Sequence, residues 1–201
     1  MTLAAAFTGA GLATVACGGA QQDAAEPKGD FKVRVTQASF PASQGIAERA
    51  RLRIEVANAD TRTIPNVAVT VETKPGRGSA APEAFGSASG DTRLADTEKP
   101  VWIVDQGPGG GTTAVTNTWA LGPLRPGDSR TFEWRLTAVR AGTYTIGYRV
   151  APGLYGRARA AAGERTKGSF RVTIADKPVP ARVDDNGNVV RGEQAGTPPK
   201  Q

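Results

Sequence analysis

The sequence predicts an all-β protein, an antiparallel β-sandwich of about seven or eight strands. Apolar and polar residues alternate with a period of two, which is typical of strands that have one buried and one solvated face. Turn-forming residues separate these stretches, and no stretch has a convincing amphipathic-helix pattern. The 25 Gly and 14 Pro residues among 201 also suit a turn-rich β protein better than a helical bundle.

Each strand is predicted from one alternating stretch. In the first half these stretches are "FKVRVTQA" from Phe31, "ARLRIEVAN" from Ala50, "PNVAVTVET" from Pro65 and "VWIVD" from Val101. In the second half they are "VTNTWALG" from Val115, "TFEWRLTAV" from Thr131, "TYTIGYRV" from Thr143 and "GSFRVTIAD" from Gly168. A strand set of this kind buries its apolar faces by packing two sheets together.

The domain boundaries follow from changes in this pattern. We expect the sandwich to span 31–176, with a loop insertion at 74–100 that is rich in Gly, Ala, Ser and Pro. A loop of this length is either functional or disordered. Residues 177–201 are predicted to be a flexible tail, in which a small hairpin can close on Asn186 and Gly187.

The start of the chain indicates export. Residues 1–16 are uncharged and contain a weakly apolar stretch whose length fits a signal peptide rather than a membrane-spanning helix. Small residues precede Cys17, the only cysteine, and residues 17–30 have the composition of a flexible spacer. This arrangement resembles the lipobox of bacterial lipoproteins, which implies cleavage before Cys17 and lipidation of its thiol. The alternatives are a leader cut elsewhere and a weak signal anchor.

The resemblance to the lipobox implies a location as well. A protein of that kind is held at the outer face of the cytoplasmic membrane or at the cell surface by a lipid anchor on Cys17. Two departures from the pattern are Thr14 at the position where leucine is preferred and the lack of Lys or Arg ahead of the apolar stretch.

A second resemblance concerns the sandwich. Residues 121–150 resemble the closing half of bacterial Ig-like surface modules of the CARDB (cell-adhesion-related) kind, and the likeness extends over 31–72 and 101–175. The matching turn residues are Leu124, Pro126, Gly127, Asp128 and Ser129, followed by Ala141, Gly142 and Tyr144. The resemblance implies an Ig-like sandwich with a role in adhesion. The spacing of Gly142 and Tyr144 also fits a tyrosine corner, in which the phenol bonds to a nearby backbone group.

The composition excludes several chemistries. The chain has no histidine, so Ser-His-Asp and Cys-His catalysis are impossible and the commonest metal ligand is missing. The "DDNGN" stretch at 184–188 lacks the spacing of an EF-hand loop. The few aromatic residues are mostly in phase with core positions, which argues against a stacking platform for nucleic acid. We therefore expect no enzyme activity, cofactor or metal, and no nucleic-acid partner.

The net charge of +6 favours anionic partners. Four basic residues fall in the loop after Val150, and a basic end of the sandwich could hold wall polymers or lipid headgroups; the alternative is a solvated loop. These residues are Arg157, Arg159, Arg165 and Lys167. Trp102 is ambiguous because both faces of its strand are apolar, so it is either a core residue or an exposed ring that stacks on a sugar.

The function we expect is that of a non-enzymatic cell-envelope lipoprotein that acts in adhesion, scaffolding or accessory binding. Its partners would be the membrane, through Cys17, and an anionic wall polymer, a glycan or a protein. The alternative is a carbohydrate- or peptide-binding module of a larger surface system.

Overall fold

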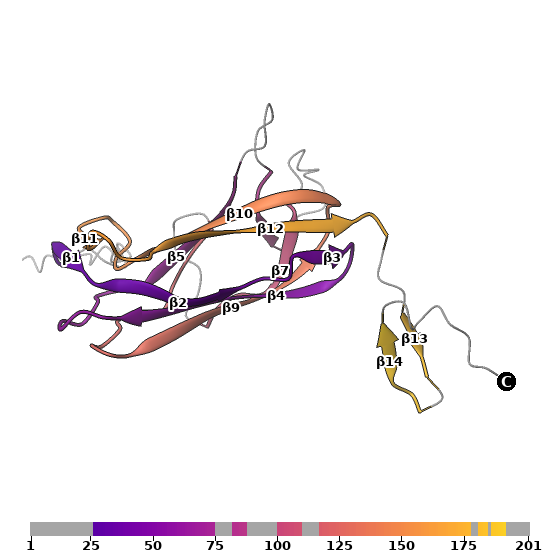
Figure 1. Cartoon of the computed structure of the whole chain (residues 1–201), viewed down its shortest axis with the longest axis horizontal. Coiled ribbons are helices and arrows are strands. Elements are labelled where there is room, and N and C mark those ends of the chain that lie inside the picture. The colour runs from indigo at the N-terminus through magenta and orange to yellow at the C-terminus, as the bar shows by residue number, and fades with distance from the viewer. Residues whose placement is uncertain are drawn as a thin grey trace, which may run out of the picture.

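Two five-stranded sheets face each other in a sandwich (Figure 1), as the sequence predicted. The structure, a computed structural model, describes residues 26–74, 82–87, 100–109, 117–177, 181–184 and 186–191. The first sheet has the order β2 (Val33–Ser39), β4 (Arg49–Asn58), β9 (Ser129–Ala138), β7 (Trp102–Gln106) and β6 (Phe85–Ser87). The second has the order β3 (Ser43–Gly45), β12 (Lys167–Ala175), β10 (Gly142–Ala151), β5 (Ala68–Thr73) and β8 (Thr118–Ala120).

The core lies between the two sheets, and its residues have the phase that the alternation predicted. In β4 the even-numbered apolar side chains are fully buried, whereas the arginines between them are exposed. The same pattern holds in β9, where Phe132, Trp134 and Leu136 have no exposed surface. Ile146 in β10 is also fully buried, at the position where a disulfide would otherwise link the sheets. Burial of apolar side chains therefore holds the sheets together, at about 1.5–3 kcal/mol for each large one.

All eight predicted strands are present, and the part of the chain that the structure describes contains six further strands of three residues each. Three of the short pairings are parallel: β6 with β7, β3 with β12, and β1 (Gly29–Phe31) with β11 (Ala158–Ala160). The strand β6 lies within the predicted 74–100 insertion, where Phe85 is 4% exposed and packs against Trp119 with ring centroids 5.6 Å apart. The sequence did not indicate this strand, because a three-residue strand is too short to show alternation.

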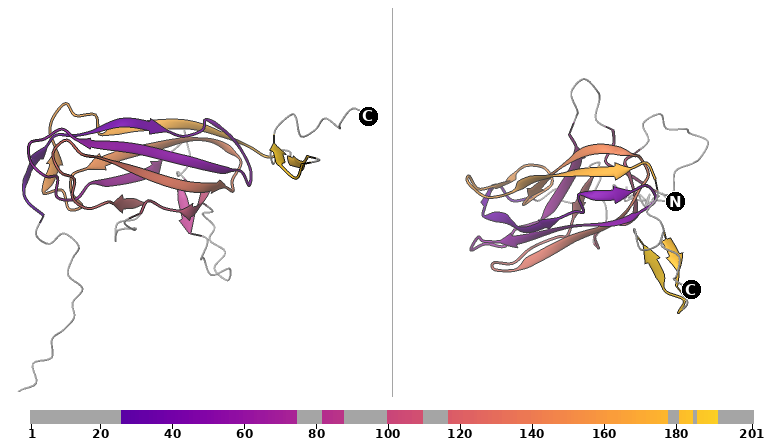
Figure 2. Two further views of the ribbon diagram at one scale, coloured as in Figure 1. Left: turned by 90° about the horizontal axis from the view of Figure 1, so that it is seen from below. Right: turned by 45° about the vertical axis from the view of Figure 1, so that its right-hand side comes forward.

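The ordered body begins before residue 31. Glu26 is buried, and β1 pairs with β11, so the last residues of the predicted 17–30 spacer belong to the sandwich. In Figure 2 this β1–β11 ribbon lies at one end of the sandwich, and the antiparallel strands β4 and β9 extend between that end and the other.

The predicted tyrosine corner is confirmed. The Tyr144 hydroxyl donates a hydrogen bond of 2.8 Å to the Ala141 carbonyl. Gly142 has a φ of 141°, and a β-carbon there would lie 2.9 Å from the Tyr144 hydroxyl oxygen. The close approach of the ring therefore requires glycine at this position.

The predicted hairpin in the C-terminal segment is present as well. The strands β13 (Ala181–Val183) and β14 (Val189–Arg191) are antiparallel, and the Asp184 carboxylate accepts hydrogen bonds from the Asn186 and Asn188 amides. Every regular element in the described ranges is a strand, and these ranges contain no helix with the length and apolar character to cross a membrane.

Candidate functional site: a basic pocket beside the loop after β10

A buried carboxylate organises the loop that joins β10 to β11. Glu26 is 3% exposed and accepts hydrogen bonds from the backbone amides of Leu154 (2.8 Å), Tyr155 (2.8 Å) and Ala158 (2.6 Å). Gly153 lies directly against this carboxyl group, and a side chain at that position would overlap it. The loop therefore folds around a residue that lies more than one hundred positions earlier in the chain.

The protonation of Glu26 reflects two opposing effects. Burial alone would raise the pKa of this carboxyl group, but hydrogen bonds from the Tyr155, Ala158, Leu154 and Arg157 amides lower it, and the net pKa lies below the ordinary value. Glu26 is consequently ionised at neutral pH and holds the loop as a carboxylate.

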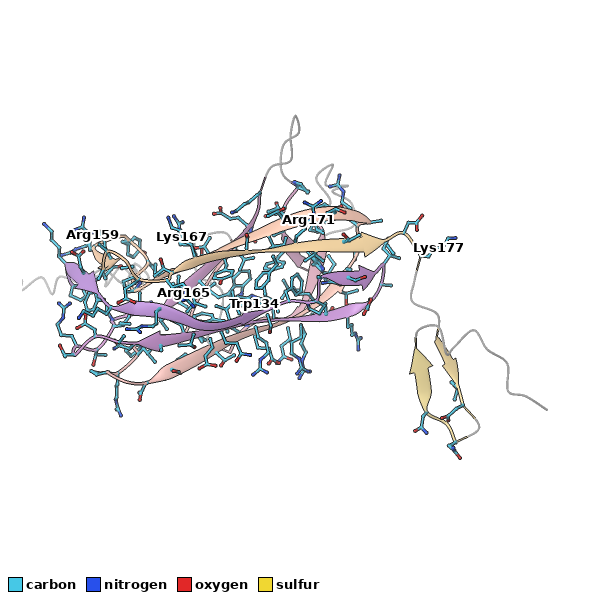
Figure 3. The ribbon with its side chains drawn as sticks, viewed as in Figure 1. Trp134, Arg159, Arg165, Lys167, Arg171 and Lys177 are labelled. Carbon is cyan, nitrogen blue, oxygen red and sulfur yellow. The ribbon has the colours of Figure 1, made fainter. Side chains whose placement is uncertain are left out.

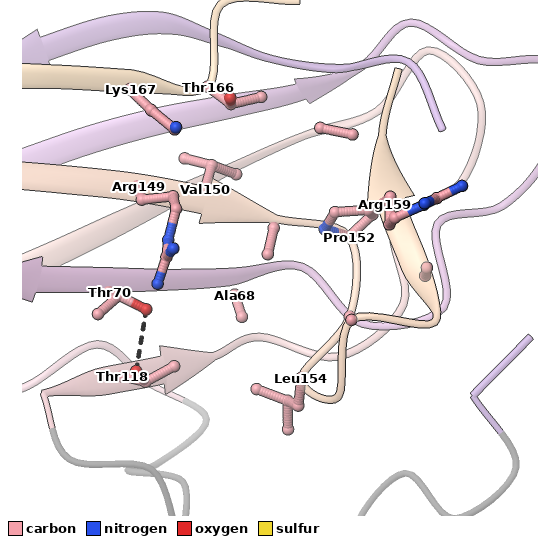
Figure 4. A pocket seen from close by; sticks show the side chains of 15 residues that line it. Ala68, Thr70, Thr118, Arg149, Val150, Pro152, Leu154, Arg159, Thr166 and Lys167 are labelled. Atoms are coloured by element: carbon pink, nitrogen blue, oxygen red, sulfur yellow. Dashed lines mark hydrogen bonds between the residues drawn. The ribbon is translucent and has the colours of Figure 1, made fainter. Parts of the chain in front are cut away.

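Beside this loop, the second sheet carries a row of hydrogen-bond donors across four strands. Lys167 in β12 lies opposite Arg149 in β10, Arg149 lies opposite Thr70 in β5, and Thr70 lies opposite Thr118 in β8. The hydroxyls of Thr70 and Thr118 are 3.0 Å apart. Figure 4 shows the Arg149 side chain extending along this row toward Thr70.

A surface pocket of about 360 Å³ lies between this row and the loop. Among the described residues, its lining includes Arg149, Lys167 and Arg159 and no carboxylate side chain. Glu72, on the same sheet, lines an adjoining pocket with Arg149 and Lys167. Two like charges directly opposite each other in a sheet destabilise it, so an anion bound between Arg149 and Lys167 would offset this repulsion. None of the six ion pairs among the described residues involves either side chain. The pocket can therefore accept a phosphate or carboxylate group without displacing a protein carboxylate.

The structure separates the four basic residues that the sequence grouped together. Lys167 lines the pocket, and Arg159 contributes to its rim while pairing with Asp30 at 3.2 Å. Arg157 is exposed on the β1–β11 ribbon. Arg165 lies beside β2, where its carbonyl accepts a 2.7 Å hydrogen bond from the Val35 amide. Figure 3 shows the spread from Arg159 at one end to Arg165 and Lys167 further along the sandwich.

The interpretation of Trp102 as an exposed ring is wrong. Its side chain has no exposed surface, and its indole N–H donates a 2.8 Å hydrogen bond to the Gln44 side chain. The ring also contacts Phe40 and Tyr144 in the core, with centroids 5.4 Å and 5.9 Å apart. The inner face of the sheet takes the larger ring because burial of an indole with its N–H satisfied is favourable. Trp102 therefore cannot stack on a sugar.

Cys17, the predicted lipidation residue, lies outside the described residues. Within the described ranges, no group of three or more Cys, Asp or Glu side chains is placed to hold a metal ion.

Sequence reasoning missed four residues of this site: Glu26, Arg149, Thr70 and Thr118. The alternation did place Arg149 and Thr70 on the solvated face of their strands, but only strand order and register bring them into one row with Lys167. Glu26 had no local signal, because its partners are backbone amides of a distant loop.

No family model and no curated protein matches this sequence. Among solved structures, the chain is similar to a CARDB domain from Pyrococcus furiosus in complex with di-metal ions, at 15% identity over 74% of this chain and 91% of that one, with a TM-score of 0.43. It is also similar to part of native α2-macroglobulin from Escherichia coli, at 14% identity over 76% of this chain and 18% of that one, with a TM-score of 0.41.

A third similar structure is a β-glucosidase from Listeria innocua in complex with glucose, at 10% identity over 75% of this chain and 16% of that one, with a TM-score of 0.41. At these identities, likenesses to proteins with such different activities give no information about a ligand or a reaction. The fold class rests on the strand order and the register described above, and it is an all-β sandwich.

Proposed function

We propose that this chain is an exported, lipid-anchored, non-enzymatic protein of the cell envelope, and that its sandwich binds an anionic partner through the basic pocket. In this proposal Cys17 carries the lipid, the residues up to Glu26 connect it to the sandwich, and the rigid sandwich presents the pocket. Its role is adhesion, scaffolding or accessory binding at the cell surface.

One observation carries the binding part of the proposal. Arg149 and Lys167 lie opposite each other on neighbouring strands, and the described residues that line their pocket supply donors but no carboxylate. A guanidinium group can form paired hydrogen bonds with phosphate or carboxylate oxygens, and an ammonium group adds a point charge beside it. The partner we favour is therefore a wall polymer with repeated phosphate or carboxylate groups.

Neutral sugars are a weaker fit to the site. Sugar binding in the sequence-based alternative relied on an exposed Trp102, and that ring is fully buried. An anionic glycan remains within the proposed class, because its charged groups would be recognised in the same way as those of another polyanion.

The binding proposal is tested with the double variant Arg149→Ser/Lys167→Ser and with poly(glycerol phosphate) as the probe. Loss of two charge-assisted contacts should weaken binding about 10- to 100-fold. The matched control is Arg51→Ser/Arg135→Ser, which removes two cations that also lie opposite each other, from the first sheet. Equal weakening by the two double variants would show that net charge rather than the pocket binds the polymer.

The anchor is tested separately by labelling cells with radioactive palmitate. Label should enter the wild-type chain and be absent from Cys17→Ser. Equal labelling of both chains would reject the anchor and leave the binding proposal to its own test.

A further inference from the structure

The outward face of the β1–β11 ribbon lies beside the pocket, shares Arg159 with it and adds residues that do not line it. Strand pairing places Gly29 beside Ala158 and Asp30 beside Arg159. The inward residues are buried or partly buried, as Phe31 and Ala158 are, while the residues between them are exposed. We name the exposed set the ribbon face. It consists of Lys28, Asp30, Arg157 and Arg159, together with Tyr155, which is exposed in the loop that leads into β11.

The ribbon face combines an aromatic ring with an excess of positive charge. Tyr155 is 50% exposed, although its backbone amide is held by the Glu26 carboxylate. Asp30 and Arg159 pair with each other at 3.2 Å, so Lys28 and Arg157 supply the excess charge. The nearby Asp60 does not neutralise them, because its carboxylate is paired with Arg62 at 3.2 Å.

The ribbon face is close to Cys17 in the sequence, and this indicates which end of the sandwich a lipid on Cys17 would hold near a membrane. Glu26, next to the ribbon, is nine residues after Cys17 in the chain. Nine residues span at most about 30 Å even when fully extended. From Asn58, which pairs with the first residue of β2, the ten residues of β4 run about 30 Å toward the opposite end of the sandwich. Because the tether would join the sandwich at Glu26, beside the ribbon, a lipid on Cys17 would hold the molecule by its ribbon end.

We propose that the ribbon face rests on an anionic lipid bilayer, with the Tyr155 ring at the level of the headgroups and with Lys28 and Arg157 beside lipid phosphates. This inference rests on the proposed lipid anchor for its direction, but the contact itself uses only described residues. Tyrosine is suited to a membrane interface because its ring is apolar and its hydroxyl is polar. Basic side chains are attracted to the negative surface potential of anionic lipids. Of the three cations that line the pocket, Arg149 and Lys167 lie on the outer face of the second sheet and stay available to a partner in the wall.

The hydrogen bonds to Glu26 hold this surface ready before it meets a membrane. Three backbone amides between 154 and 158 are fixed by one carboxylate, and the Gly29 amide donates a 3.1 Å hydrogen bond to the Arg157 carbonyl. The loop therefore loses little conformational freedom when it binds, which favours a contact made by only three side chains.

The test uses the full chain carrying Cys17→Ser, so that no lipid contributes to binding. Its co-sedimentation is measured with vesicles of phosphatidylcholine that contain about a third phosphatidylglycerol, and with vesicles of phosphatidylcholine alone. In this background, Lys28→Ser/Arg157→Ser should reduce partition onto the anionic vesicles about tenfold or more, because each basic residue near the surface contributes severalfold. Tyr155→Ser should reduce it by a smaller factor on both kinds of vesicle.

The control is again Arg51→Ser/Arg135→Ser, which lowers the net charge equally and should change partition less than twofold. Equal losses in the two double variants would overturn the proposal, as would vesicle binding that none of the ribbon substitutions changes. Binding to poly(glycerol phosphate) with no binding to anionic vesicles would also overturn it, and would identify the ribbon as a second polymer contact. The co-sedimentation assay uses the Cys17→Ser chain, so its result does not depend on palmitate labelling. The lipid anchor and the membrane contact of the ribbon face can therefore be rejected independently.

Discussion

The outer faces of the two sheets differ in the pairing of their charged side chains. Each face carries two cations that lie opposite each other on neighbouring strands: Arg51 and Arg135 on the first sheet, and Lys167 and Arg149 on the second. On the first sheet, Glu133 contacts Arg51 at 3.4 Å and Arg53 at 3.3 Å.

Arg49 on the same face lies 3.9 Å from Asp105. On the second sheet, no carboxylate among the described residues lines the 360 Å³ pocket, and Glu72 in the adjoining pocket forms none of the six ion pairs found among these residues. Exposed ion pairs contribute little to stability, but they occupy the guanidinium groups that a ligand would need. The number of arginines on a face therefore does not identify a binding site. The positions of the carboxylates relative to these cations do identify it.

The two faces also differ in what lies beside them. The basic row of the second sheet is bordered by a loop that is fixed to Glu26, whereas the arginines of the first sheet lie on an open strand surface with a pocket of about 500 Å³. Both faces are supported by the same core. The following substitutions separate the contributions of the core, of the loop held by Glu26 and of the surface charges to the stability of the protein.

The core substitution has the largest expected effect. Trp102→Ala should destabilise the protein by about 3–5 kcal/mol, because it leaves a large cavity. It also removes the hydrogen bond to Gln44. Urea denaturation measures this loss. A stable Trp102→Ala variant with altered ligand binding would contradict the burial of this ring.

Glu26→Gln should destabilise the protein by about 2–4 kcal/mol, because the buried carboxylate is lost as the acceptor of three backbone amides. Its effect has a defined pH dependence. The folded pKa of Glu26 lies below its ordinary value of 4.5, so the stabilisation is fully present above that pH and is lost as the pH falls through the folded pKa. The difference in unfolding free energy between wild type and variant should be constant from pH 8 to pH 6 and should shrink in acid. A difference that grows in acid would contradict the assignment.

Gly153→Ala should have a similar but smaller effect of about 1–3 kcal/mol, because the added methyl group overlaps the Glu26 carboxyl group. Its effect should be non-additive with that of Glu26→Gln, since both act on the same contact. Gly163→Ala serves as a comparison in the same region, because its surroundings are open and only its φ of 83° is unfavourable. Full additivity of the Gly153 and Glu26 effects in a thermal-denaturation cycle would argue against direct contact.

Charge reversals have the smallest expected effects and opposite signs on the two faces. Lys167→Glu should stabilise the protein by about 0.5 kcal/mol, because it places a carboxylate opposite Arg149. Glu133→Lys should destabilise it by about 1 kcal/mol, because it removes the carboxylate that Arg51 and Arg53 share. Both changes are measured by urea denaturation at low salt. The same sign for both would show that the two faces do not differ in charge pairing.

The sequence by itself determined the strands and the identity of most core residues. Alternation with a period of two is a local property, because successive side chains of a strand point to opposite faces whichever strands lie beside it. It therefore placed Phe132, Trp134 and Ile146 in the core correctly. The spacing of Gly142 and Tyr144, also a local feature, located the tyrosine corner. Alternation could not assign Trp102 to the core or to the surface, because a strand that is apolar on both sides has no preferred face.

Only the tertiary structure decided the site. The row from Lys167 to Thr118 requires the order β12, β10, β5, β8, and the loop beside it requires a carboxylate from the start of the described chain. These are contacts between residues far apart in the sequence, and hydrogen bonds from backbone amides depend on no particular side chain in the loop that donates them. The pattern of side chains along a strand indicates which face of that strand is buried, but it does not indicate which strand lies next to that strand in the sheet.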